Sequence, residues 1–144
     1  MDREQILAKK PGPETDVLIA EYIFGWRKMP GPKTDYDGPC ESYDVLIPPT
    51  IDDPFPLYPP RGAIKPWCFC HLWSTDLPAA WEVAEKFERI TIERTVHGSE
   101  HGWCCEVFTY DNGYKLTMNY AYAEKAPEAI CKAALLSKLA VTCK

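Results

Sequence analysis

Apolar and polar positions alternate most clearly between residues 73 and 88, with the period of an amphipathic helix. One side of this helix is apolar and the other charged: the apolar stripe comprises Leu77, Ala80, Trp81, Ala84 and Phe87, and the charged side comprises Glu82, Glu85, Lys86 and Glu88. Ser74, Thr75 or Asp76 can accept a hydrogen bond from the first turn, where Pro78 is also tolerated. We therefore expect a capped helix with one buried face, around which the chain is organised.

Three further helices are expected nearer the ends of the chain. Asp2 can cap a short helix over residues 3–8, and Pro13 suits the start of a second helix that runs to about Gly25. The second helix has an inward face formed by Ile19, Ala20, Ile23, Phe24 and Trp26. An alanine-rich helix over residues 126–139 closes the chain, and its small side chains allow close approach to a sheet.

Strand patterns fill the second half of the chain. Residues 64–73 have strand character, and residues 90–96 are β-branched with period two. Residues 103–110 and 114–123 flank Asp111, Asn112 and Gly113, which predict a hairpin. In its second arm, Tyr114, Leu116, Met118, Tyr120 and Tyr122 share one face, and Lys115, Thr117, Asn119 and Ala121 share the other. This order of elements predicts an α+β fold in which helices sandwich an antiparallel sheet.

The segment over residues 29–66 differs in composition from the rest of the chain, because it holds ten of the fourteen prolines. Proline removes hydrogen-bond donors and fixes φ, so regular helix or central strand is not expected over most of this segment. Its aromatic and aliphatic content exceeds that of a solvated linker. We expect one domain over residues 1–144, with residues 29–66 a long ordered loop inserted after the first main helix and packed against the domain.

Composition narrows the class of protein. No apolar run approaches the roughly 18 residues of a membrane-spanning helix, and the charged N-terminus leads into no secretory signal. A net charge of −5 argues against broad binding to duplex DNA, which depends on many contacts between basic side chains and phosphates. The seven cysteines are an odd number, which favours free thiols inside a cell. We expect neither a membrane partner nor duplex DNA.

Metal and catalytic chemistry find little support in the sequence. Cysteines and histidines are numerous enough for a zinc site, but no CxxC occurs, and neighbours such as Cys104 and Cys105 point to opposite faces of a strand. His97 and His101 lie near Cys104 in sequence, yet nothing fixes them as a nucleophile and base. The sequence also holds no P-loop and no GxGxxG. We therefore expect no metal, no cofactor and no catalytic residue, although a hydrolase with paired carboxylates stays open.

Ligand binding fits the composition better. Tryptophan and tyrosine exceed what one small core needs, and aromatic faces stack on bases, while Arg and Lys pair with phosphates. For most of these side chains, core packing or a surface charge is the simpler interpretation. The candidate ligand-binding residues are Trp67, Trp73, Trp103, Tyr120, Arg61, Lys65 and Arg94.

Three separated stretches resemble one known family. Residues 2–14 with 18–26, then 74–83, and finally 126–135 are similar to the phage ABA sandwich domain family, small proteins of bacteriophages and prophages in which helices flank a sheet. The resemblance covers about half of the chain. It implies a fold and a viral origin but carries no catalytic motif. The long Pro-rich segment departs from the shorter members of the family.

Small phage proteins of this sort are often counter-defence factors, so the resemblance implies work in the cytoplasm of the infected bacterial host. Together with the aromatic and basic residues, it predicts a non-catalytic protein that sequesters a small nucleotide-derived immune signal of the cyclic nucleotide or ADP-ribose type. Two alternatives stay open: an inhibitor that binds a host defence protein through the Pro-rich loop, and a hydrolase of such signals. A homodimer is reasonable, because a small domain with strand edges can pair with itself.

Overall fold

The sheet and the four helices are described by a computed structural model, which covers residues 1–30, 44–47, 72–95, 102–111 and 115–142. The helices in these residues are α1 (Arg3–Ala8), α2 (Pro13–Tyr22), α3 (Leu77–Ala84) and α4 (Ala126–Thr142). The strands are β1 (Arg27–Pro30), β2 (Asp44–Ile47), β3 (Arg89–Arg94), β4 (Trp103–Asp111) and β5 (Lys115–Ala123). The α+β fold class is confirmed.

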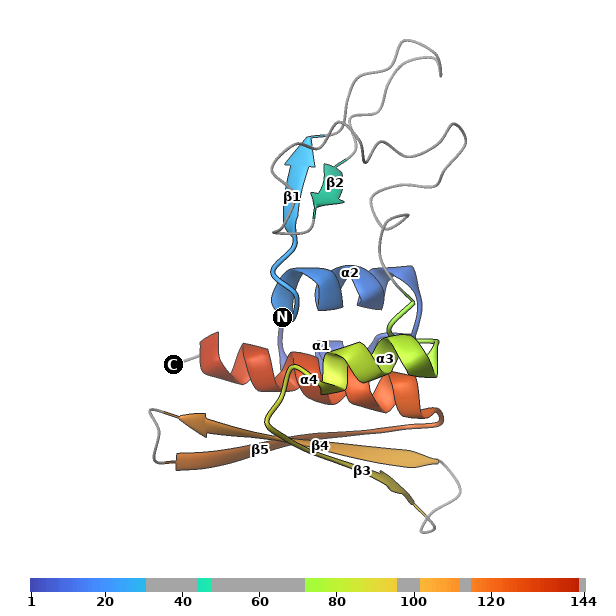
Figure 1. Cartoon of the computed structure of the whole chain (residues 1–144), viewed down its shortest axis with the longest axis vertical. Helices are drawn as coiled ribbons and strands as arrows, with labels where there is room; N and C mark the ends of the chain where they lie inside the picture. The colour runs from blue at the N-terminus through green and yellow to red at the C-terminus, as the bar shows by residue number, and fades with distance from the viewer. Residues whose placement is uncertain (31–43, 48–71, 96–101, 112–114, 143–144) are drawn as a thin grey trace.

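The main sheet has the antiparallel order β3-β4-β5, with Cys105 of β4 opposite both Ile92 and Ala121. The predicted hairpin is thus formed by β4 and β5. Figure 1 shows the four helices on one side of this sheet, with α4 directly against it. The described helices thus cover one face of the sheet and leave the other open.

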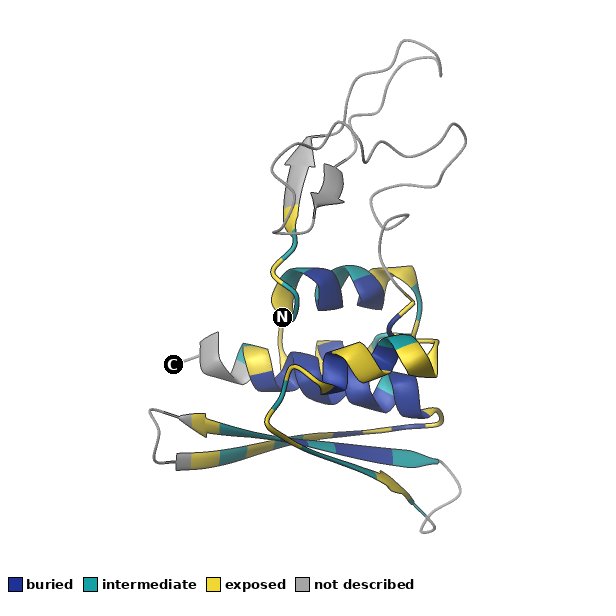
Figure 2. Ribbon diagram, viewed as in Figure 1, coloured by how far each residue is buried: buried dark blue, intermediate teal, exposed yellow. Residues whose placement is uncertain are grey.

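Helix α4 occupies the centre of the described fold, and its residues 129–137 are all buried (Figure 2). It packs on β4 and β5 below and on α1, α2 and α3 above. Ala129, Ala133 and Ala134 are fully buried, and their small side chains let the surrounding backbones come close. Lys132 is also buried, and its Nζ donates to the carbonyl of Leu7 at 2.8 Å and to Glu128 Oε1 at 2.6 Å. The Lys132 ammonium therefore fastens the end of α1 to α4.

Buried polar contacts join the starts of α2 and α3. The Asp16 carboxylate accepts a hydrogen bond from the backbone N–H of Ser74 at 2.8 Å, and Ser74 Oγ accepts one from the Gly12 N–H at 2.8 Å. Asp16 and Ser74 are each 1% exposed. Because these groups satisfy one another away from water, they fix the position of α3 relative to α2.

The N-terminal helices begin where the sequence predicts. Asp2 caps α1 by accepting from the Gln5 N–H, and Gln5 returns a bond to the Asp2 N–H, which completes a capping box. Helix α2 starts at Pro13 and ends at Tyr22, slightly before the expected end. Gly25 takes φ +70°, and the N–H of the next residue bonds to the Ala20 carbonyl, which closes the helix in a left-handed turn.

The predicted buried face of α3 is partly wrong. Asp76 caps this helix as expected, but the buried residues are Ala80, Val83 and Ala84, whereas Leu77 is 51% and Trp81 53% exposed. The interface with α4 is built from small side chains, so a tryptophan there would force the two helices apart. The helix is therefore rotated from the orientation that the apolar stripe suggests.

A pair of short strands, one that begins two residues before the Pro-rich segment and one that lies within it, was not predicted from the sequence. Arg27 to Pro30 of β1 pair antiparallel with Ile47 to Asp44 of β2. The rest of residues 29–66, with the expectation that they form an ordered loop, lies outside the described residues. Most of the strand predicted over residues 64–73 also lies outside them, and Trp73, at its end, is in a turn before α3.

We predict that the stability of Asp16→Asn, relative to that of the original protein, increases as the pH rises. Burial raises the pKa of Asp16 above its ordinary value, although hydrogen bonds from Ser74 lower it. A carboxyl whose pKa is raised in the folded state makes its full contribution to folding stability below the pKa that it has in the unfolded chain. That contribution is lost as the pH rises through the pKa of the folded state. Asp16→Asn keeps an acceptor for Ser74 and does not ionise. Its Tm, measured relative to the original protein, should increase between about pH 4 and about pH 7.

The matched control is Asp16→Ala, which also does not ionise but leaves the buried Ser74 N–H without its acceptor. It should show the same pH trend and be less stable than Asp16→Asn by about 1–3 kcal/mol at every pH. A Tm difference between Asp16→Asn and the original protein that stays constant across this pH range would contradict the prediction.

Candidate ligand-binding site

The side of the main sheet that faces away from the helices is rich in exposed aromatic and aliphatic side chains. Because directly paired residues of antiparallel strands share a face, the strand register defines this outer face. It comprises Arg89, Thr91 and Glu93 of β3, Cys104, Glu106, Phe108 and Tyr110 of β4, and Leu116, Met118, Tyr120 and Tyr122 of β5. Tyr110, Leu116, Met118, Tyr120 and Tyr122 are 39–56% exposed.

The orientation of the sheet follows from the requirements of α4. The residues of β5 that face this helix include Ala121 and Ala123, which are 1% and 5% exposed. Small side chains there permit a close approach, which tyrosines would prevent. The two faces of β5 are those that the alternation predicts, but the aromatic one faces away from the core.

Two guanidinium groups lie against aromatic rings of the outer face. Arg3 of α1 places Cζ 5.0 Å from the Tyr120 ring centroid and donates from Nη2 to the Tyr120 carbonyl at 3.3 Å. Arg89 places Cζ 4.6 Å from the centroid of Phe108. Contacts of this kind hold a cation over the ring face. Both positive charges are therefore already placed beside surfaces on which a planar group can stack.

The remaining groups of the outer face complete its chemistry. The Tyr120 and Tyr122 rings meet edge to face at 5.7 Å. The nearby Cys104 thiol raises the pKa of Tyr122, so its hydroxyl stays protonated at neutral pH. Glu93 and Glu106 add acceptors on the same face. The outer face can therefore stack a ring, pair with an anion and accept hydrogen bonds.

Of the predicted ligand-binding residues, Tyr120 lies on the outer face. Arg94 and Trp103 are directly paired across β3 and β4, at one end of the sheet and on the side of the helices. Arg94 is exposed there and Trp103 half-buried, packed against the core. Arg94 and Trp103 are therefore neighbours, but they lie on the opposite face of the sheet from Tyr120. Arg61, Lys65 and Trp67 lie outside the described residues.

The structure gives Trp73 a role in the core. Its side chain is 1% exposed, its ring stacks on Phe24 with centroids 4.8 Å apart, and Trp26 meets it edge-on at 5.8 Å. Its Nε1 donates to Glu82 at 3.2 Å. Because the ring is enclosed, it has no surface for a ligand.

Arg3 and Arg89 were missed in the sequence analysis. Arg89 adjoins the predicted strand over residues 90–96, so a hairpin register would have placed it beside Phe108. Arg3 lies 117 residues from Tyr120 in the sequence, and no local pattern connects them.

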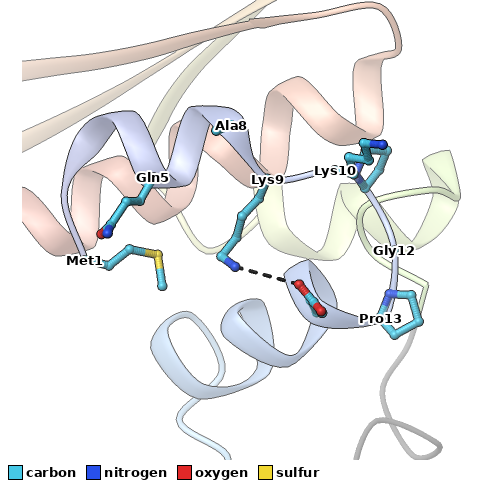
Figure 3. A pocket seen from close by; sticks show the side chains of 9 residues that line it. Met1, Gln5, Ala8, Lys9, Lys10, Gly12 and Pro13 are labelled. Atoms are coloured by element: carbon cyan, nitrogen blue, oxygen red, sulfur yellow. Dashed lines mark ion pairs between the residues drawn. The ribbon is translucent and has the colours of Figure 1, made fainter.

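A cleft of about 1090 Å³ lies between α1 and the start of α2 (Figure 3). Its basic side chains include Lys9, which points across the cleft to Glu14 at 3.9 Å. The Gly12 N–H, at the start of α2, is already bonded to Ser74. These polar groups bind one another, so the cleft is a weaker candidate than the outer face.

Metal and thiol chemistry are not assembled in the described residues. There, no group of three or more His, Cys, Asp or Glu is placed to hold a metal ion. Cys104, Cys105 and Cys131 are free and buried. Burial raises the pKa of Cys105 to about 12 and that of Cys131 well above its ordinary value. These thiols are poor nucleophiles at neutral pH. Within the same residues, no helix is long and apolar enough to cross a membrane.

Comparison with known proteins gives two matches. Residues 17–135 match the phage ABA sandwich domain. The chain is also similar to a phage protein from Bacillus cereus ATCC 14579, known from a 2.0 Å crystal structure. The two are 27% identical with a TM-score of 0.55, over 90% of this chain and 93% of the other. No curated protein matches this chain.

We predict that Cys105 and Cys131 resist alkylation in the native protein. Because only the thiolate reacts readily, their raised pKa values and burial should slow reaction with iodoacetamide at pH 8 by more than tenfold relative to the unfolded chain. Peptide mass spectrometry after timed labelling measures each cysteine separately. Equal rates before and after denaturation would show that the thiols are accessible.

Proposed function

Because the chain belongs to the phage ABA sandwich domain family, we propose that it is a phage counter-defence protein that binds and sequesters a small nucleotide-derived host signal without catalysis. The outer face of the sheet is the binding surface. The observation that supports this most is the gathering of exposed aromatic rings and two ring-bound guanidinium groups on that one face. Its place of action is the cytoplasm of the infected host.

Stacking would supply much of the affinity. A base stacked on an aromatic side chain contributes about 1–3 kcal/mol. Tyr120 is 39% and Tyr122 46% exposed, so both offer ring surface to a flat ligand. The tyrosines are held by a sheet, which limits the entropy lost on binding. The site thus favours a planar heterocycle over a flexible chain.

Charge favours a ligand with few phosphates. Arg3 and Arg89 can each pair with a phosphate in bidentate fashion. Glu93 and Glu106 on the same face, and the net charge of −5, oppose a long polyanion. Glu106, opposite Tyr120, can accept a hydrogen bond from a base N–H. These features support a cyclic nucleotide or an ADP-ribose derivative as the class of ligand.

Sequestration requires binding but no reaction. The low reactivity of the Cys104 thiol on the outer face supports such a role. Burial raises the pKa of Cys104, with further contributions from neighbouring charges, so its thiol stays protonated at neutral pH. A protonated thiol is a weak nucleophile.

A second candidate is inhibition of a host defence protein. Leu116 and Met118, with Tyr110, make the other half of the outer face apolar. Tyrosine, phenylalanine and methionine are enriched in protein interfaces, and large exposed apolar patches often mark them. In this case the outer face would bind the partner, alone or with the Pro-rich segment.

We predict that Tyr120→Ala weakens nucleotide binding about 5- to 150-fold, the equivalent of the stacking energy of one base. Thermal unfolding with AMP, ADP-ribose and cyclic di-AMP would select a ligand, because a ligand that binds only the native state raises Tm. Titration calorimetry then gives Kd for each variant. Trp81→Ala is the matched control, since Trp81 is 53% exposed on α3 and outside the outer face.

Chromatography of the ligand released by heat tests for catalysis, because a sequestering protein returns it intact. A panel without any Tm shift, or equal losses for Tyr120→Ala and Trp81→Ala, would refute nucleotide binding at this face. Recovery of a chemically altered ligand would indicate hydrolysis instead of sequestration.

A further inference from the structure

A small cavity of about 250 Å³ opens at the β5 edge of the sheet, between α1, β5 and α4. Its apolar wall is formed by Ile6, Leu136 and Leu139, and its polar groups come from Asp2, Arg3 and Asn119. Its volume is that of roughly eight waters at ~30 Å³ each. The cavity therefore has room for one purine or pyrimidine ring system.

Asn119 gives this cavity an unused hydrogen-bond donor. Its Nδ2 is buried and has no hydrogen-bond partner among the residues that the structure describes. Leaving such a group unsatisfied costs about 1–3 kcal/mol. A donor of this kind fits an acceptor on a heterocycle, and an asparagine amide matches the paired donor and acceptor of adenine.

The cavity and the outer face lie on opposite sides of one strand edge. Asn119 is paired with buried Val107 and so belongs to the side of the helices, whereas the next residue, Tyr120, belongs to the outer face. Arg3 lines the cavity and also lies over the Tyr120 ring, with its Nη2 on the Tyr120 carbonyl at that edge. A single side chain thus connects the two places.

We propose that the ligand is a dinucleotide that straddles the edge of β5. One base stacks on Tyr120 at the outer face, and the other enters the cavity, where Asn119 donates to a ring nitrogen or carbonyl. The Asp2 carboxylate, which lines the same cavity, can accept from an exocyclic amino group. Arg3 pairs with the phosphate that joins the two nucleosides. This proposal rests on nucleotide binding at the outer face and defines the class of ligand.

The test compares 5′-phosphorylated ApA with AMP by titration calorimetry, using the full chain. The dinucleotide should bind at least about tenfold more tightly, because each base has its own site and each good base contact contributes about 1–3 kcal/mol. Asn119→Leu should remove this advantage and leave the Kd for AMP unchanged. Leu139→Phe, which fills the cavity without touching Asn119, should do the same and serves if Asn119→Leu unfolds. Thr117→Val, on the same side of β5, is the control.

Failure of this proposal is separable from failure of nucleotide binding. Equal Kd values for AMP and the dinucleotide, or a loss in Asn119→Leu that is as large for AMP as for the dinucleotide, would overturn dinucleotide recognition. AMP binding that depends on Tyr120 would survive either result. An adenylate octamer shows where the dinucleotide unit can come from. If the octamer displaces the dinucleotide, the unit can belong to a longer strand. If it does not, the free dinucleotide is required.

Discussion

The fold depends on the burial of α4 between the sheet and the other three helices. A helix with apolar side chains around most of its surface is stable in water only when those sides are covered. Alanines on α4 and on β5 set how closely the layers approach, and the buried ammonium of Lys132 is matched by Glu128 and by the Leu7 carbonyl. Replacing Glu128 would leave the buried Lys132 ammonium with the Leu7 carbonyl but no opposite charge, which is far costlier than losing an exposed ion pair.

The same constraint produces the candidate site. Once the small side chains of β5 face α4, strand alternation sends the tyrosines to the opposite side, where no described helix covers them. The outer face is therefore a direct consequence of how the core is packed. Its cations reach it from two directions, Arg89 from within the sheet and Arg3 from α1, across the β5 edge.

Local signals in the sequence were sufficient for most element boundaries. Asp2, Pro13 and Asp76 mark helix starts through chemistry that acts within one turn, and the Asn-Gly pair marks the hairpin. Which face is buried was harder to predict, because it depends on a distant partner. A stripe containing Trp81 has the pattern of a core, as does a row of tyrosines, yet both are excluded by the close contacts that alanines make with α4.

The candidate site was predictable only in part for the same reason. Tyr120 could be found from its place in an aromatic row, but its association with Arg3 joins the two ends of the chain. The short strands of the Pro-rich segment pair residues across an intervening stretch, which proline content alone does not indicate.

The length of α1 has a consequence for the energetics of the site. A helix of six residues is far too short to persist in water without tertiary support. The position of Arg3 is thus maintained by the anchoring of α1 to α4 through Lys132, on the inner side of the domain. Local unfolding of α1 would remove the guanidinium from Tyr120 while the sheet stayed intact. The anion affinity that we propose for the outer face is therefore coupled to the local unfolding of one short helix.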